Sequence, residues 1–83
     1  MDKLLIGLFV PAISEHYDLF APPGLKIGEL TKILANAVAD LSSGRYTVSQ
    51  QEMLSASETG ILLHPDRCLA DYGICDGAQL VLI

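Results

Sequence analysis

Positive charge is scarce in this sequence: five lysines and arginines stand against ten acidic residues, which gives a formal net charge of −5 at pH 7. A protein that binds nucleic acid needs a basic face against the phosphates, so the composition argues against DNA or RNA as a partner. Charged residues of either sign make up only 18% of the chain, whereas 51% of the residues are apolar. That much apolar surface excludes a disordered chain and predicts a folded binding module of 83 residues.

Cysteine is also sparse, and its spacing excludes two classes of protein. Cys68 and Cys75 are too few for the disulfide scaffold of a small secreted domain. They also lack the short paired interval of a zinc site, and His16 and His64 lie far apart in the sequence. No glycine-rich loop for phosphates precedes a helix. We therefore predict free thiols, a reducing cytoplasmic location, and neither a metal nor a cofactor.

The sequence contains no cluster of polar residues that marks an active site. The tripeptide His64-Pro65-Asp66 matches that of J-domain co-chaperones, but short predicted strands flank it here, so we interpret it as a turn. His16 lies beside Glu15 and Asp18, yet strand alternation places its side chain on an outer face in water. We therefore expect no catalytic residues and no enzymatic activity.

Long hydrophobic runs are absent as well. The apolar run Leu4–Val10 is far shorter than the roughly 20 residues that cross a bilayer. With its flanks it is also shorter than a signal peptide, which takes about 15–30 residues. We expect no membrane insertion and no cleaved leader, and we predict a buried first strand instead.

The remaining pattern predicts one α+β domain over residues 1–83. Strands are expected at 4–10, 16–21, 52–56, 61–63 and 79–83, with a main helix over 27–41 and a helical turn at 69–72. The helix is indicated by apolar residues spaced three and four apart, which are Ile27, Leu30, Leu34, Ala37, Val38 and Leu41. The order is ββαββ, a short helical turn, then β. The apolar last strand is expected at the centre of a mixed sheet, next to the first strand, with the helix across the sheet.

The stretch Gly60–Ile74 resembles the C-terminal half of ubiquitin, and the element order is that of the ubiquitin β-grasp. The core of the motif is Leu69-x-Asp71-Tyr72-x-Ile74. Leu69 and Ile74 are expected to close one end of the core, and Asp71 to cap local amides. The resemblance implies that the Tyr72 hydroxyl bonds to the backbone near His64.

A more specific resemblance is to the YukD-like proteins, small bacterial ubiquitin-like components associated with type VII secretion. It rests on Tyr17-Asp18-Leu19, followed by a proline-containing bend and an apolar helix. It also rests on the ending that contains Leu69, Asp71, Ile74, Asp76, Gly77 and Leu80. The loop from Ser43 to Gln51 carries no match. The resemblance implies a non-catalytic accessory or regulatory component of a Trp-x-Gly secretion system, bound to the membrane machinery through protein contacts.

Conjugated ubiquitin relatives and sulfur-carrier proteins end in a flexible Gly-Gly tail, whose carboxylate is adenylated. Here Ile83 ends the last predicted strand. We therefore expect a protein that is not conjugated to targets, with a conjugated modifier or sulfur carrier as the alternative.

The candidate binding surface lies on the sheet face that the helix leaves open. Alternation sends Leu80 and Leu82 inward and Val81 and Ile83 outward. Met53 on the neighbouring strand and Phe20 on another strand are expected to join them. These four residues would bind a protein partner or a second copy of the chain. The alternative is that they are scattered exposed apolar residues, which most proteins have.

Overall fold

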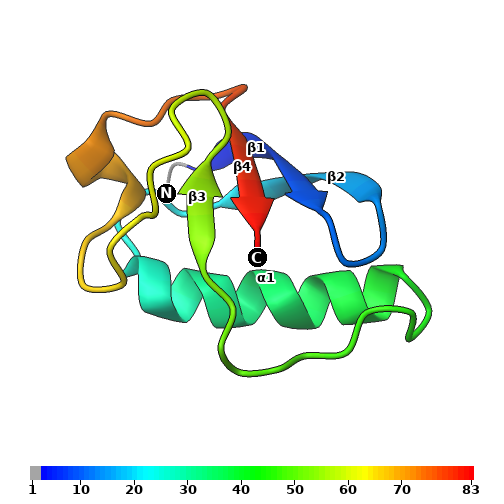
Figure 1. Ribbon diagram of the computed structural model, residues 1–83. Helices are drawn as coiled ribbons and strands as arrows, with labels where there is room; N and C mark the ends of the chain where they lie inside the picture. Colours follow the sequence, from blue (N-terminus) through cyan, green and yellow to red (C-terminus); the bar gives the residue numbers. More distant parts are fainter. Residues whose placement is uncertain (1–2) are drawn as a thin grey trace.

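A four-stranded sheet and a single long helix make up the structure (Figure 1), a computed structural model that describes residues 3–83. The strands are β1 (Leu4–Val10), β2 (Glu15–Ala21), β3 (Leu54–Ala56) and β4 (Gln79–Leu82). The helix α1 spans Ile27–Leu41, and the short 3-10 helix η1 spans Leu69–Tyr72. The sheet has the order β2-β1-β4-β3, and α1 runs across one of its faces. This arrangement confirms the predicted α+β class.

The two central strands come from opposite ends of the described chain. β1 pairs antiparallel with β2 from Leu4↔Ala21 to Val10↔Glu15, and parallel with β4 through Leu8↔Leu80. β4 pairs antiparallel with β3 on its other side. The sheet is therefore mixed, with the last strand between the first and the third, as its apolar character predicted.

The helix begins without a side-chain cap, and the structure shows what replaces one. The backbone N–H of Ile27 donates to the Arg67 carbonyl at 2.7 Å, and the N–H of Gly28 donates to the Pro65 carbonyl at 2.9 Å. These bonds satisfy two of the amides that a helix start leaves without partners inside the helix. The segment before η1 thus caps α1 with its backbone, which no N-cap residue in the sequence could indicate.

The buried face of α1 differs from the predicted face. Thr31 and Ala35 are buried, whereas Ala37 is half-buried and Leu41 is 55% exposed. At 3.6 residues per turn, the buried stripe is rotated toward Thr31 and Ala35 relative to the predicted one. Thr31 tolerates burial because its hydroxyl donates to the Ile27 carbonyl at 2.6 Å. The predicted stripe omitted Thr31 and Ala35 and was therefore wrong on this side.

The predicted strand at 61–63 is also wrong. It is reduced to an isolated bridge between Leu62 and Ser55. β3 offers only three residues for pairing, and the chain turns at Pro65, two residues after Leu63. Because proline lacks a backbone donor, the ladder cannot continue there.

The ubiquitin-like motif has the expected contacts around η1. Leu69 is fully buried and Ile74 half-buried at one end of the core. The Cys68 N–H donates to the Asp71 carboxylate at 3.0 Å, and this bond holds the pKa of Asp71 below its usual range. The His64 N–H donates to the Tyr72 hydroxyl oxygen at 2.9 Å. The predicted bond between Tyr72 and the backbone near His64 is thus confirmed.

Replacing Tyr72 with phenylalanine removes this acceptor and is expected to lower the free energy of unfolding by about 1 kcal/mol. Urea denaturation followed by circular dichroism measures the change. Tyr17→Phe is the matched control, because among residues 3–83 no hydrogen bond to the Tyr17 hydroxyl is found. Equal losses in both variants would contradict a specific role for the Tyr72–His64 bond.

Candidate functional site

The sheet face opposite α1 carries a row of apolar side chains that the strand register places side by side. Phe9 of β1 is paired with Val81 of β4, and Val81 is paired with Ser55 of β3. The bridge to Ser55 then brings Leu62 beside the same row. Paired residues on neighbouring strands point to the same face of a sheet. The row therefore runs from Phe9 through Val81 to Leu62, with the buried Ser55 between Val81 and Leu62.

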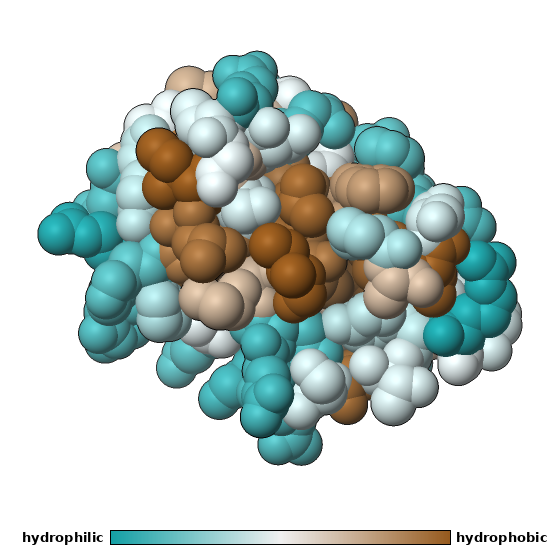
Figure 2. Space-filling view, viewed as in Figure 1, coloured by the Kyte–Doolittle hydropathy of each residue, from teal (hydrophilic) through white to brown (hydrophobic). Residues whose placement is uncertain are grey.

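Met53 and Ile83 extend this row toward the end of β4. The Ile83 N–H donates to the Met53 carbonyl at 2.9 Å, and the Met53 N–H donates back to the Ile83 carbonyl at 3.1 Å. Met53 is 42% and Ile83 63% exposed. Figure 2 shows hydrophobic side chains gathered over the side of the molecule where β3 and β4 lie. We call Phe9, Met53, Leu62, Val81 and Ile83 the β4 patch.

The structure brings together three of the four predicted site residues and leaves Phe20 apart. Phe20 is paired with Leu5, near the other end of β1, and β1 separates its strand from β4. The polar row Asp18–Gly7–Gln79 crosses the sheet between Phe20 and the β4 patch. The Gln79 carboxamide lies over Gly7, where a Cβ would collide with it. The exposed Phe20 and Leu5 therefore form a second, smaller apolar area.

Two members of the β4 patch, Phe9 and Leu62, were missing from the predicted set. The run Leu4–Val10 is apolar at every position except Gly7, so it gives no alternation from which to choose an outward residue. In the structure Leu5 is exposed and Phe9 half-buried, because no helix or strand within residues 3–83 covers the outer face. Leu62 could be assigned only once its bridge to Ser55 was known.

His16 lies at the margin of the β4 patch. Its ring packs on Phe9, with 4.6 Å between the ring centroids and 32° between the planes. The side chain is exposed, as its position on the outer face predicted. Cys68 and Cys75 are free thiols. Residues 3–83 contain no group of three or more histidine, cysteine or acidic side chains placed to hold a metal ion. Within the same residues, no helix is long and apolar enough to span a membrane.

The loop between α1 and β3 borders the patch and is fixed by a pair of side chains. The hydroxyl of the buried Tyr46 donates to the Glu52 carboxylate at 2.8 Å, and the Ser49 N–H donates to the same oxygen at 2.6 Å. A cavity of about 310 Å³ lies between Tyr46, Pro11 and Ile83. The loop from Ser43 to Gln51, which the resemblance to YukD-like proteins does not cover, therefore forms one side of the candidate site.

The pKa values of Tyr46 and Glu52 are both shifted from their ordinary values. Burial, together with the hydrogen bond to Glu52 and the negative charge of that residue, raises the pKa of Tyr46 to about 12. Burial on its own raises the pKa of Glu52. The hydrogen bonds from Ser49 and Tyr46 outweigh it and hold that pKa below its usual value. The two shifts describe a protonated phenol bound to an ionised carboxylate.

Comparison with known proteins shows a fold shared by many solved structures. No protein-family model and no curated protein sequence matches the chain. The ubiquitin-like domain of Arabidopsis thaliana protein At2g32350 is similar over 100% of this chain and 78% of its own, with a TM-score of 0.73 and 21% identity. Caldiarchaeum subterraneum ubiquitin is similar over 99% of this chain and 92% of its own, with a TM-score of 0.68 and 19% identity.

A third similar structure comes from a secretion system. The ubiquitin-like domain of the Mycobacterium tuberculosis type VII secretion system protein ECCD1 is similar over 100% of this chain and 99% of its own. Its TM-score is 0.66 and its identity 16%. At these identities the likeness concerns the path of the backbone. The chain therefore has a ubiquitin-like fold.

Proposed function

We infer that this protein is a non-catalytic module that binds a protein partner through the β4 patch. The observation that carries the proposal is the continuous row from Phe9 through Val81 to Leu62, on a sheet face that α1 leaves open. Met53 and Ile83 extend it with exposed side chains. A contiguous apolar area on an otherwise polar surface is typical of protein–protein contacts.

The partner is proposed to belong to a type VII secretion system. Two observations support this context. The sequence resembles the YukD-like proteins, and the fold is similar to the ubiquitin-like domain of ECCD1 over the whole chain. We place the protein in the cytoplasm as an accessory or regulatory component of a Trp-x-Gly secretion system. It contacts the membrane machinery through proteins, not through lipid, and binds partners without being conjugated to them.

A binding assay with purified components tests the proposal. The probes are the cytosolic ATPase of a type VII system and a Trp-x-Gly secreted protein, each measured against the wild-type chain and the double variant Val81→Asp, Ile83→Asp. Burying a carboxylate in an apolar interface is unfavourable, so the variant is expected to bind at least about tenfold more weakly. Isothermal titration calorimetry gives both affinities.

The control places one carboxylate on another exposed apolar residue. Ile33 on α1 is 55% exposed and lies away from the patch, so Ile33→Asp is expected to bind like the wild type. Unchanged binding by a folded Val81→Asp, Ile83→Asp variant would refute the assignment of the surface. Sedimentation of the chain alone tests self-association through the same face. An adenylate formed with an activating enzyme and ATP would favour the conjugated modifier or sulfur carrier instead.

A further inference from the structure

A second concave surface lies between the loop that follows β3 and the segment that leads into β4. It encloses about 450 Å³ and shares no residue with the β4 patch. Ala56, Leu63, Ile74 and Leu80 form its apolar floor. Glu58, Asp76 and Tyr72 also lie among its lining residues. We call this surface the acidic groove.

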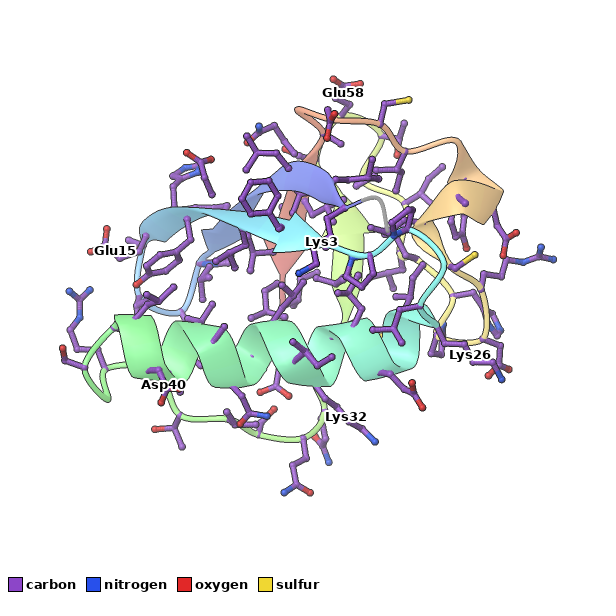
Figure 3. All side chains as sticks on the ribbon, turned by 180° about the vertical axis from the view of Figure 1, so that it is seen from behind. Lys3, Glu15, Lys26, Lys32, Asp40 and Glu58 are labelled. Atoms are coloured by element: carbon purple, nitrogen blue, oxygen red, sulfur yellow. The ribbon has the colours of Figure 1, made fainter. Side chains whose placement is uncertain are left out.

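The charged residues of the groove have one sign in the part of the chain that the structure describes. Among residues 3–83 its lining contains Glu58 and Asp76 and no lysine, arginine or histidine. Within residues 3–83 the ion pair that is found joins Arg45 to Glu15, outside the groove. The Asp76 Oδ1 accepts a hydrogen bond from the Leu5 N–H at 2.8 Å, and within residues 3–83 no hydrogen bond to Oδ2 is found. A carboxylate can accept at both oxygens. Figure 3 shows Glu58 at the end of the molecule opposite α1.

We propose that the acidic groove receives an arginine side chain of a protein partner. An arginine has an aliphatic stem that buries well on an apolar floor and a charged head that stays at the rim. Its guanidinium donates in a planar fork that suits carboxylates and stacks on aromatic rings such as that of Tyr72. The lining of the groove contains these three features together: apolar residues, two acidic residues and an aromatic residue. The β4 patch supplies none of the carboxylates.

A short peptide tests the proposal directly. The probe is acetyl-Leu-Arg-amide, titrated into the ¹⁵N-labelled chain and followed by amide chemical shifts. The matched neutral probe is acetyl-Leu-citrulline-amide, which keeps the shape of arginine but not its charge. The arginine peptide is expected to give saturable shifts at Glu58–Ile61 and Cys75–Gln79. The citrulline peptide is expected to bind at least about threefold more weakly, since its neutral ureido group forms hydrogen bonds without the charge of an ion pair.

Charge-neutral variants identify the carboxylates. Glu58→Gln and Asp76→Asn are each expected to weaken binding of the arginine peptide about two- to fivefold, the range for exposed ion pairs. Asparagine keeps an oxygen for the Leu5 N–H, so the start of β1 is preserved. Asp40→Asn, on the exposed face of α1, is the control and is expected to change nothing.

Three results would overturn the assignment. The first is equal binding of the arginine and citrulline peptides. The second is a pattern of shifts that lies outside the groove. The third is the same pattern from spermidine, which would show a surface that attracts any cation. The Val81→Asp, Ile83→Asp variant is expected to bind the arginine peptide like the wild type, so failure of the β4 patch proposal and failure of this one are distinguishable.

Discussion

Replacing Leu80 with alanine is expected to lower the free energy of unfolding by about 3–5 kcal/mol. Leu80 is 1% exposed and lies in β4, with Leu8 beside it on one strand and Ala56 on the other. Its side chain therefore packs at the centre of the core, where the removed atoms leave a cavity. A chain of 83 residues has a total stability of only about 4–12 kcal/mol. The loss is thus a large share of the total, and the midpoint of thermal unfolding should fall by at least about 10 °C.

The control for this experiment is the next residue of the same strand. Val81 points to the outer face and is half-buried, so Val81→Ala is expected to cost less than about 1.5 kcal/mol. Differential scanning calorimetry measures both variants against the wild type. A loss at Val81 as large as the loss at Leu80 would contradict the orientation of β4. It would then also contradict the location of the β4 patch.

Replacing Tyr46 with alanine is the second change with a large expected effect, about 3–5 kcal/mol. Tyr46 is 8% exposed and belongs to the core, although it lies in the loop between α1 and β3. Its backbone N–H donates to the Ser42 hydroxyl oxygen at 3.0 Å. Loss of the ring is expected to release the loop from the core. Amide hydrogen exchange should then rise over 43–52 before it rises in the strands.

Two smaller variants separate the ring of Tyr46 from its hydroxyl. Tyr46→Phe keeps the ring and removes the bond to Glu52, so we expect a loss of about 1 kcal/mol. Glu52→Gln removes the charge that accepts from Tyr46 and Ser49. If Tyr46→Phe destabilised the protein as much as Tyr46→Ala, packing of the ring would not be what holds the loop.

The Tyr46–Glu52 pair also predicts a pH dependence at high pH. The pKa of Tyr46 is about 12 in the folded protein and 10.0 as its ordinary value, so the folded state holds the phenolic proton more tightly. The stability that this provides is complete below pH 10 and is lost between pH 10 and pH 12. Urea denaturation across this interval should show a decline that is absent in Tyr46→Phe. An identical decline in the variant would rule out Tyr46 as its source.

At low pH, Glu52 determines how the pair's contribution to stability changes with pH. The pKa of Glu52 is lower in the folded protein than its ordinary value of 4.5, so its contribution is present above that pH and is lost as the pH falls through the folded value. The Glu52→Gln variant is expected to lack this decline in stability at low pH, while it keeps every other carboxylate.

The elements that the sequence predicted well are those with a strong repeating pattern. The helix over 27–41 was bounded correctly, since apolar residues recur along it and Ser42-Ser43-Gly44 ends it. The apolar ending 79–83 identified a central strand for the same reason. The predicted strand at 61–63 failed because its pairing depends on a three-residue partner and on the turn at Pro65. Neither property can be read from three consecutive apolar residues.

The candidate site shows a different limit. Alternation gave the outward direction of Val81 and Ile83, and both point outward in the structure. Grouping them with Phe20 required the register between strands, which local sequence does not contain. The register instead pairs Phe20 with Leu5 and brings Phe9 beside Val81. Which residues share a face is therefore a local property, and which of them touch is a property of the whole sheet.

The parallel pairing of β1 with β4 has a consequence for the order of events during synthesis. Gly7 and Gln79 are neighbours in the sheet although about 70 residues of chain separate them. While a ribosome still holds β4 in its exit tunnel, the hairpin of β1 and β2 has an open edge where its central partner belongs. Closing so long a loop costs chain entropy before any contact compensates for it. The nascent chain therefore stays incomplete until β4 emerges, and a chaperone that binds apolar strand edges would meet β1 in that interval.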